Sequence, residues 1–359
     1  MNTQIYSKSQ NSISTKKNLI MALVVLCPFI LLPIIFSTLG PSSKAFPTKK
    51  YVSVYEKLID GAPVNILVVG DSISAGAGST KGHSWAVQIP ELIKTTYGSE
   101  CHLTNLSIGG TTSVAGIVKE EMLDDGVNYD LVIICYGEND VDDATFSSSY
   151  EGIIRSSQSK YPGCSIICVL ESSQREYTSK INTIINIAQF HNIPIADTIK
   201  AFAESGYKYE DLVNAPDDLT HPNDKGHEIY LNTIANVISN QMNVNTVYTT
   251  DTHQFDTTVF YSKSDFKKID NKTFSLSLDN PVAAKISVYS TRIPGENGIR
   301  VFADDSVVYE SSYEWSFDIQ QEYIETLTDS PVCINKNLLI EFPSKETAKG
   351  FVGILLSDF

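Results

Sequence analysis

The segment Val64–Ser72 constrains the fold of this chain more than any other, because it joins an apolar run to a Gly-Asp-Ser turn. Ile66–Val69 is a short continuous apolar run bounded by turn residues, which is typical of a central strand in a parallel sheet. A serine just beyond such a strand lies at its carboxyl end, where open α/β sheets build their sites. Its hydroxyl and backbone N–H can then serve nucleophilic chemistry. A three-residue string is equally consistent with an ordinary strand-to-loop turn, so the interpretation depends on partners elsewhere.

Strand-like and helix-like patterns alternate from Val64 to about Gln241. Repeated βα units with short connections imply a parallel sheet covered by helices on both faces. The sequence therefore predicts a flavodoxin-like three-layer α/β/α sandwich with a five-stranded parallel sheet over residues 61–243. The predicted strands are Asn65–Val69, His102–Leu106, Leu131–Cys135, Ser165–Leu170 and Ile193–Ala196. The predicted helices are Trp85–Tyr97, Ser113–Met122, Ser148–Lys160, Lys180–His191 and Asp224–Asn240.

After about Val244 the pattern changes to short runs that alternate with a period of two. Turn residues separate these runs, as they do in antiparallel sheets. The sequence predicts a smaller all-β sandwich domain over residues 244–359. The aromatic residues Tyr313, Trp315 and Phe317 alternate as core residues of one strand do, which favours packing over stacking on sugar rings.

An uninterrupted apolar stretch, Leu19–Phe36, lies near the N-terminus and is long enough to cross a bilayer. We therefore expect a cytoplasmic tail and a transmembrane signal-anchor over residues 1–40, followed by a linker over residues 41–60. The protein would then be single-pass and membrane-anchored, with its catalytic domain outside the cytoplasm. Ser43-Lys-Ala45 can also be a cleavage site, which leaves secretion after signal cleavage as the alternative.

Charge and cysteine usage exclude several classes of partner. The net charge of −15 argues against a nucleic-acid partner, because no basic face is present to neutralise phosphates. The 6 cysteines show neither a CxxC pair nor Cys/His ligand spacing. The sequence therefore supports no metal site and no disulfide framework.

An aspartate and a histidine, Asp218 and His221, follow the fifth predicted strand and precede the last predicted helix. Hydrolysis by a serine needs a base to take the serine proton and a carboxylate to orient that base. With this spacing in a turn, the Asp218 carboxylate can reach the His221 Nδ1–H and leave Nε2 for Ser72. Asp217 competes weakly with Asp218 for that role, and a helix-capping pair is the alternative interpretation.

Two further segments are expected at the same edge of the sheet. Asn139 follows the third strand in Gly137-Glu-Asn-Asp140, and its amide can donate to an oxyanion. Gly110 follows the second strand, where a glycine exposes its N–H without steric hindrance, and Gly109 is adjacent. Each segment alone is also explained by a turn or a helix entry. Together, in this order after these strands, they predict a serine esterase site.

The motifs resemble those of the SGNH hydrolase superfamily, the GDSL-type esterases and lipases, here in a membrane-anchored bacterial form. The resemblance covers roughly residues 60–241. The matching blocks are Gly-Asp-Ser72, the glycine Gly110, Gly137-Glu-Asn139-Asp and Asp218-Leu-Thr-His221. The resemblance implies a catalytic set of Ser72, Asp218 and His221, and an oxyanion hole formed by the Ser72 N–H, the Gly110 N–H and the Asn139 amide. It implies no metal and no organic cofactor.

The implied activity is hydrolysis of carboxylic esters through an acyl-enzyme. A membrane anchor with an accessory β domain favours removal of O-acetyl groups from cell-surface or extracellular carbohydrate. A lysophospholipase or another lipid-directed esterase is the alternative, because the anchor would also place the site near phospholipids. A non-catalytic glycan-binding protein on a hydrolase fold is a third possibility, and the intact residue set argues against it.

Overall fold

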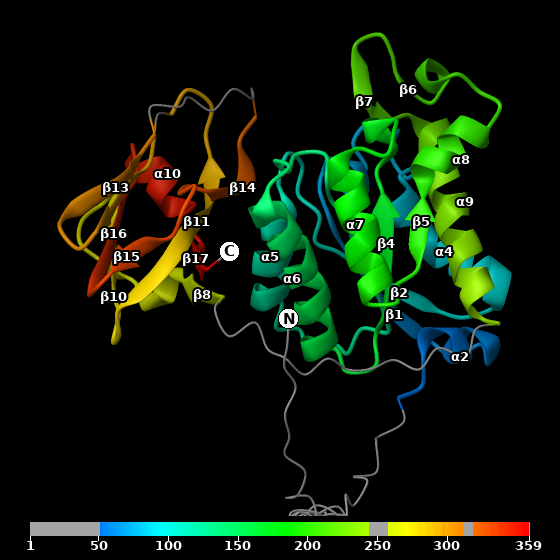
Figure 1. Ribbon diagram of the computed structural model, residues 1–359, viewed down its shortest axis with the longest axis horizontal. Coiled ribbons are helices and arrows are strands. Elements are labelled where there is room, and N and C mark those ends of the chain that lie inside the picture. The colour runs from blue at the N-terminus through cyan, green and yellow to red at the C-terminus, as the bar shows by residue number, and fades with distance from the viewer. Residues whose placement is uncertain (1–50, 244–257, 297, 312–318, 359) are drawn as a thin grey trace, which may run out of the picture. The chain divides into compact units, whose positions relative to one another are not determined.

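The structure is a computed structural model that describes residues 51–243, 258–296, 298–311 and 319–358. Its α/β domain contains a five-stranded parallel sheet in the order β2-β1-β3-β4-β5 (Figure 1). The strands are β1 Val64–Gly70, β2 Cys101–Asn105, β3 Leu131–Cys135, β4 Ser165–Leu170 and β5 Ile195–Asp197. This order and direction confirm the predicted flavodoxin-like fold.

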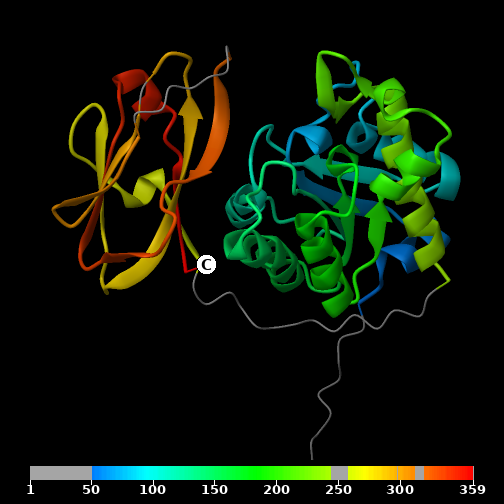
Figure 2. The same cartoon turned by 45° about the horizontal axis from the view of Figure 1, so that its top comes forward.

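Helices cover both faces of this sheet (Figure 2), and each face has its own hydrophobic core. Strands β3 and β4 are buried along their whole length, which explains their continuous apolar sequence. On one face lie α5 Ser113–Met122, α6 Ala144–Lys160 and α7 Ser179–Phe190. The other face is covered by α2 Val54–Ile59, α4 Trp85–Tyr97, α8 Thr198–Glu204 and α9 Asp224–Gln241.

Three of these helices differ from the sequence-based expectation, and one of them, α8, was not predicted at all. Helix α6 begins at Ala144 rather than Ser148, because the Asp143 carboxylate accepts a hydrogen bond from the Phe146 N–H at 3.0 Å and caps the helix. Helix α2 lies within the segment predicted as a linker. A capping box between Ser53 and Glu56 starts it, and three of its residues are buried in the core.

The second domain contains two antiparallel sheets, in agreement with the predicted all-β domain. Their strand orders are β13-β12-β16-β10-β9 and β14-β11-β17-β8, with β15 paired to β11. Four phenylalanine rings, Phe266, Phe274, Phe342 and Phe351, contact one another in its core. The elements are β8 Val259–Ser262, β9 Lys267–Lys268, β10 Thr273–Ser277, β11 Val282–Arg292, β12 Arg300–Ala303, β13 Ser306–Glu310, β14 Gln321–Thr326, β15 Val332–Ile334, β16 Asn337–Glu341, α10 Lys345–Lys349 and β17 Gly353–Ser357. Tyr313, Trp315 and Phe317 lie outside the described residues.

Helix α5 of the α/β domain contacts the β domain. Tyr289, Ile324 and Leu355 of the β domain share the hydrophobic core that contains the buried face of α5. Lys119 Nζ on α5 donates a hydrogen bond to the Tyr289 hydroxyl at 3.1 Å. The β domain therefore packs against the helix that follows the predicted oxyanion glycines.

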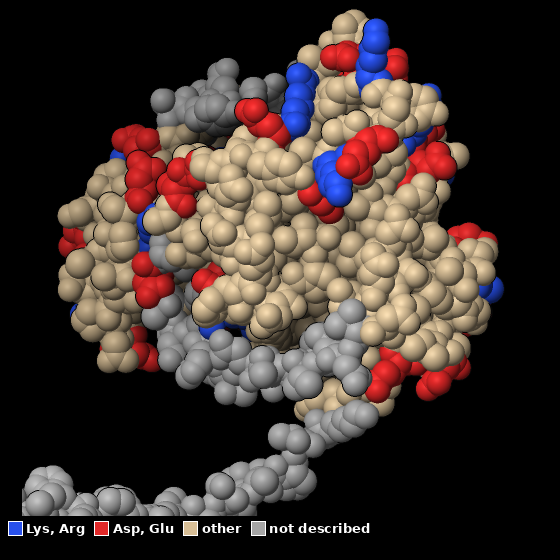
Figure 3. Space-filling view, turned by 45° about the vertical axis from the view of Figure 1, so that its right-hand side comes forward, with Lys and Arg blue, Asp and Glu red and all other residues tan. Residues whose placement is uncertain are grey.

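The predicted anchor and tail, residues 1–40, lie outside the described residues. Among the helices that are described, none combines the length and the apolar character that a membrane span requires. Figure 3 shows basic side chains interspersed with acidic ones toward the end of the molecule where β6, Val213–Asn214, and β7, Asp218–Pro222, lie in Figure 1. The acidic residues that are in excess in the chain are therefore not spread uniformly over this face of the molecule.

Candidate active site

Ser72 leaves the carboxyl end of β1 as the first residue of the single-turn helix α3, Ser72–Ala75. The Asp71 carboxylate caps this helix, with Oδ1 accepting from the Ile73 N–H at 3.0 Å. Gly70 permits the tight turn, because a Cβ there would lie 2.0 Å from Ser74 Oγ and 2.4 Å from the Cys135 carbonyl oxygen. The N–H of a first helical residue has no partner within its helix, so the Ser72 N–H is available to a ligand.

Ser72, His221 and Asp218 form one hydrogen-bonded chain, although 149 residues separate Ser72 from His221. His221 Nε2 lies 2.9 Å from Ser72 Oγ, and His221 Nδ1 lies 2.6 Å from Asp218 Oδ2. Both distances are within normal hydrogen-bond range. The structure thus brings the three residues together in the arrangement that nucleophilic catalysis requires.

Asp218 and His221 lie in a short strand, β7 Asp218–Pro222, which pairs with β6 Val213–Asn214. This corrects the expected simple turn. Both oxygens of the Asp218 carboxylate are engaged. Oδ2 contacts the imidazole, and Oδ1 accepts from the backbone N–H groups of Thr220 at 2.9 Å and His221 at 3.0 Å. The alternative Asp217 is exposed, and the contact to the imidazole comes from Asp218.

The pKa of Asp218 is lowered. Partial burial acts to raise it, but hydrogen bonds from the His221 N–H, the His221 imidazole and the Thr220 N–H outweigh that burial. The carboxylate is therefore ionised at neutral pH. An ionised Asp218 holds the His221 Nδ1–H and stabilises the imidazolium that forms when Nε2 takes a proton.

Asn139 follows β3 and is exposed at the edge of the site. Its Nδ2 donates to Asp71 Oδ2 at 3.2 Å and to the Thr111 carbonyl oxygen at 3.1 Å. The amide is thus oriented by two acceptors on other segments. To reach an oxyanion above Ser72, one of its N–H groups has to be shared with these acceptors.

Gly109 and Gly110 differ in how they face the site. A Cβ on Gly109 would lie 3.6 Å from Ser72 Cβ, whereas one on Gly110 would lie 3.7 Å from the Tyr323 ring. Gly110 adopts a φ of +74°, which favours glycine. Neither glycine N–H donates a backbone hydrogen bond within the described part of the chain. Both remain available as donors, and the choice of Gly110 stays a prediction.

Three further residues position this site and were not found from the sequence. Lys180 Nζ donates to the carbonyl oxygens of Gly137 at 2.6 Å, Glu138 at 3.2 Å and Asp140 at 2.9 Å, which holds the turn that carries Asn139. Gln321 Nε2, from β14, donates to the Gly109 carbonyl oxygen at 3.0 Å. Neither residue belongs to a motif that would have identified it.

Glu171 is the third. It directly follows β4 and is fully buried under the site, where Oε2 accepts from the Glu138 N–H at 2.6 Å. The position of Glu171 directly after a buried strand could have identified it from the sequence, because β1, β2 and β3 are also followed by site residues.

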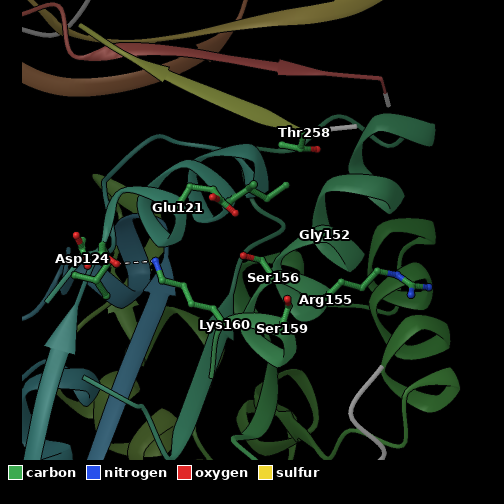
Figure 4. Close-up of a pocket in the computed structure, with 10 residues that line it drawn as sticks. Glu121, Asp124, Gly152, Arg155, Ser156, Ser159, Lys160 and Thr258 are labelled. Atoms are coloured by element: carbon green, nitrogen blue, oxygen red, sulfur yellow. Dashed lines mark hydrogen bonds between the residues drawn. The ribbon is translucent and has the colours of Figure 1, made fainter. Parts of the chain in front are cut away.

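A separate pocket of about 470 Å³ lies between α5 and α6 (Figure 4). Lys160 at its wall donates to the Leu123 carbonyl oxygen at 2.6 Å. Arg155, also at the wall, is paired with Glu151. None of the predicted site residues lines this pocket, and its two cations, Arg155 and Lys160, already have partners.

Comparison with known proteins agrees with the geometry of the site. Residues 68–229 match the model of the GDSL-like lipase/acylhydrolase family. The match covers most of the α/β domain. Together with the geometry of the site, this match identifies the protein as a carboxylic ester hydrolase. No curated protein sequence matches the chain.

Two solved structures resemble both domains. One is a two-domain esterase active on acetylated mannans, co-crystallised with mannopentaose, with a TM-score of 0.66, 18% identity, and coverage of 85% of this chain and 94% of that chain. The other is described as the same kind of two-domain esterase, with a TM-score of 0.65, 18% identity, and coverage of 85% and 94%. At this identity the likeness shows the shared two-domain fold.

Proposed function

We propose that this esterase uses Ser72 as its nucleophile, His221 as its general base and Asp218 as the residue that orients His221. The observation that carries the proposal is the continuous hydrogen-bonded chain, with 2.9 Å from Ser72 Oγ to His221 Nε2 and 2.6 Å from His221 Nδ1 to Asp218 Oδ2. In the proposed reaction, His221 Nε2 takes the hydroxyl proton as Ser72 Oγ attacks the ester carbonyl carbon.

The tetrahedral intermediate carries a negative oxygen that needs donors. We propose the Ser72 N–H, the Gly110 N–H and the Asn139 amide for this role. Collapse of the intermediate breaks the bond to the alcohol oxygen, which receives the proton from His221. Water then attacks the acyl group on Ser72, again with His221 as the base, and the acid and the free serine are released.

The substrate that we propose is an O-acetyl group on cell-surface or extracellular carbohydrate. The site is open, since Asn139 is exposed and Leu219, next to Asp218, has an exposed side chain. An open site suits a small acyl group on a large polymer. The two-domain esterase with the same architecture is described as active on acetylated mannans, which supports this choice. Attachment to a membrane through residues 1–40, with the catalytic domain outside the cytoplasm, is part of the proposal.

A comparison of two substrates tests the substrate class. We expect acetate release from an acetylated mannan to exceed fatty-acid release from a lysophospholipid. The reverse order would favour the lipid-directed alternative, which the apolar N-terminal stretch motivates.

Substitution of the nucleophile tests the mechanism. Ser72→Ala should lower kcat on nitrophenyl acetate by about 10⁵–10⁶-fold while the circular dichroism spectrum stays unchanged. A fluorophosphonate probe should label the wild type at Ser72. Retained turnover by the variant would refute the assignment, and a wild type that neither labels nor turns over substrate would point to a non-catalytic glycan-binding protein.

A further inference from the structure

Two carboxyl groups lie in contact beneath the site, and the proposed mechanism uses neither of them. Asp71 and Glu171 are both 0% exposed. Their carboxyl groups are close enough for each to shift the pKa of the other through a hydrogen-bonding interaction. An ionised carboxylate can only accept a hydrogen bond, so a bond between two carboxyl groups requires a proton on one of them. The pair therefore holds a proton when the hydrogen bond is present.

The contacts of the two groups indicate which one carries the proton. Both Asp71 oxygens already accept hydrogen bonds, Oδ1 from the Ile73 N–H at 3.0 Å and Oδ2 from Asn139 Nδ2 at 3.2 Å. Glu171 accepts on Oε2 from the Glu138 N–H, while the neighbour of Oε1 is the thiol of Cys135, with Sγ at 3.6 Å. A thiol is a weak donor, so Glu171 has an oxygen that can hold the proton.

Two separate connections join Glu171 to Asn139. One passes through Asp71, whose Oδ2 accepts from the Asn139 amide. The other passes through the main chain, because Glu171 Oε2 binds the N–H of Glu138, the residue before Asn139, at 2.6 Å. Movement of the Glu171 side chain would therefore disturb both the amide group of Asn139 and its backbone.

We propose that Glu171 is a positioning residue of the esterase, which donates its proton to Asp71 and so places the Asn139 amide for the oxyanion. This inference rests on the proposed oxyanion role of Asn139. The Glu171 proton occupies part of the acceptor capacity of Asp71, so Asp71 holds the Asn139 N–H less tightly and an oxyanion can compete for it. It also limits the pair to one negative charge next to the site where a negative oxygen develops.

The charged and titratable groups around the pair are compatible with this arrangement. The Glu138 carboxylate accepts from Ser173 Oγ and Gln174 Nε2, each at 2.6 Å, and the Asp140 carboxylate accepts from Ser113 Oγ at 2.7 Å. The cation Lys180 binds the main chain of the same turn. The other neighbours are the thiol of Cys135 and the hydroxyls of Tyr136, Tyr150 and Tyr230, whose pKa values are all raised well above the ordinary range, mainly by burial.

Burial also supports a retained proton. It raises the pKa of Glu171 well above its ordinary value and that of Asp71 to about 7, and the negative charges of Asp71 and Glu138 add to the effect on Glu171. Burial therefore favours a proton on the pair, and the hydrogen-bond contacts assign it to Glu171.

The test compares substitutions of the two carboxyl groups in the full-length protein. Glu171→Gln supplies an amide N–H for the bond to Asp71 and an oxygen for the Glu138 N–H, so kcat on nitrophenyl acetate should stay within about threefold of wild type. Asp71→Asn replaces one carboxylate oxygen, an acceptor, by an amide N–H, a donor. That N–H faces the Glu171 proton or the Asn139 amide, which are donors as well, so one hydrogen bond is lost and kcat should fall by at least about tenfold. Glu120→Gln is the matched control, since Glu120 is also fully buried but belongs to α5 and accepts a hydrogen bond from Ser157 of α6.

A double-substitution cycle tests whether Glu171 acts through Asn139. Glu171→Leu should lower kcat by about tenfold with KM nearly unchanged, but should have little further effect when Asn139→Ala is already present. Additive losses would show that the effect of Glu171 is merely structural and would overturn the proposal. If Glu171→Leu does not fold, the test is the difference in kcat between Glu171→Gln and Asp71→Asn. Equal losses of kcat in those two variants would overturn the proposal. Ser72→Ala reports on the proposed function alone, because it leaves both carboxyl groups in place.

Discussion

Two pairs of side chains at the same edge of the sheet both include an aspartate, and their surroundings give them opposite properties. The side chains of Asp218 and His221 are 36% and 27% exposed, and hydrogen bonds lower the pKa of Asp218. Asp71 and Glu171 are fully buried, and burial raises the pKa of both. Solvent and backbone donors keep Asp218 charged, which suits it to stabilise an imidazolium. Burial leaves the other pair with a shared proton, which suits it to orient neutral donors.

The largest effect that distinguishes the two pairs is expected at Asp218. Asp218→Asn should lower kcat by about 10⁴-fold, because an amide favours the wrong tautomer of His221 and cannot stabilise its charged form. Steady-state kinetics on nitrophenyl acetate measures this. Asp217→Asn, at the exposed neighbouring position, is the control and should leave kcat unchanged. A loss in the control that matches the loss at Asp218 would mean that the wrong aspartate has been assigned.

A smaller effect is expected where the buried pair meets the site, at Asn139. Asn139→Ala should lower kcat by about 10²–10³-fold with little change in KM, since an oxyanion donor acts in the transition state and not on the bound ester. The kcat and KM values for a short acyl ester measure the two effects separately. A raised KM with an unchanged kcat would instead make Asn139 a substrate-binding residue.

The smallest effect on activity, but a clear one on stability, is expected at Glu120. Burial raises the pKa of Glu120 from 4.5 to about 8, and within the described residues its Oε2 has no hydrogen-bond partner. The stability contributed by the protonated group is full below pH 4.5 and is lost as the pH rises toward 8. Glu120→Gln removes this loss, which amounts to about 1.4 kcal/mol for each pH unit within that range.

The free energy of unfolding in urea, measured for wild type and variant between pH 4.5 and pH 8, tests this. The advantage of the variant should grow with pH, while kcat at pH 7 should match that of wild type. A difference in stability that does not vary with pH would show that Glu120 is ionised throughout. A change in kcat would show that burial of a carboxyl group alone, without contact to the site, affects catalysis.

Much of the fold and the site was predictable from the sequence for a local reason. The sheet strands begin and end close to the predicted positions, because a continuous apolar run between turn residues is visible in the residues themselves. Ser72 and Asn139 each follow such a run, so their presence at the carboxyl edge of the sheet follows from the direction of the strands. The short helix α2 was missed because only six residues form it, and its burial depends on contacts with the sheet.

The sequence by itself determined the α/β architecture, the change to an all-β domain, and the residues that meet at the edge of the sheet. Only the tertiary structure decided how those residues are held: Glu171 against Asp71, Lys180 beneath the Asn139 turn, and Gln321 on Gly109 from 212 residues away. The physical reason is that periodicity and turn chemistry act between neighbours in the chain. Whether a carboxyl group keeps its proton depends on its burial and on the hydrogen-bond donors around it. These come from segments that meet only when the chain folds.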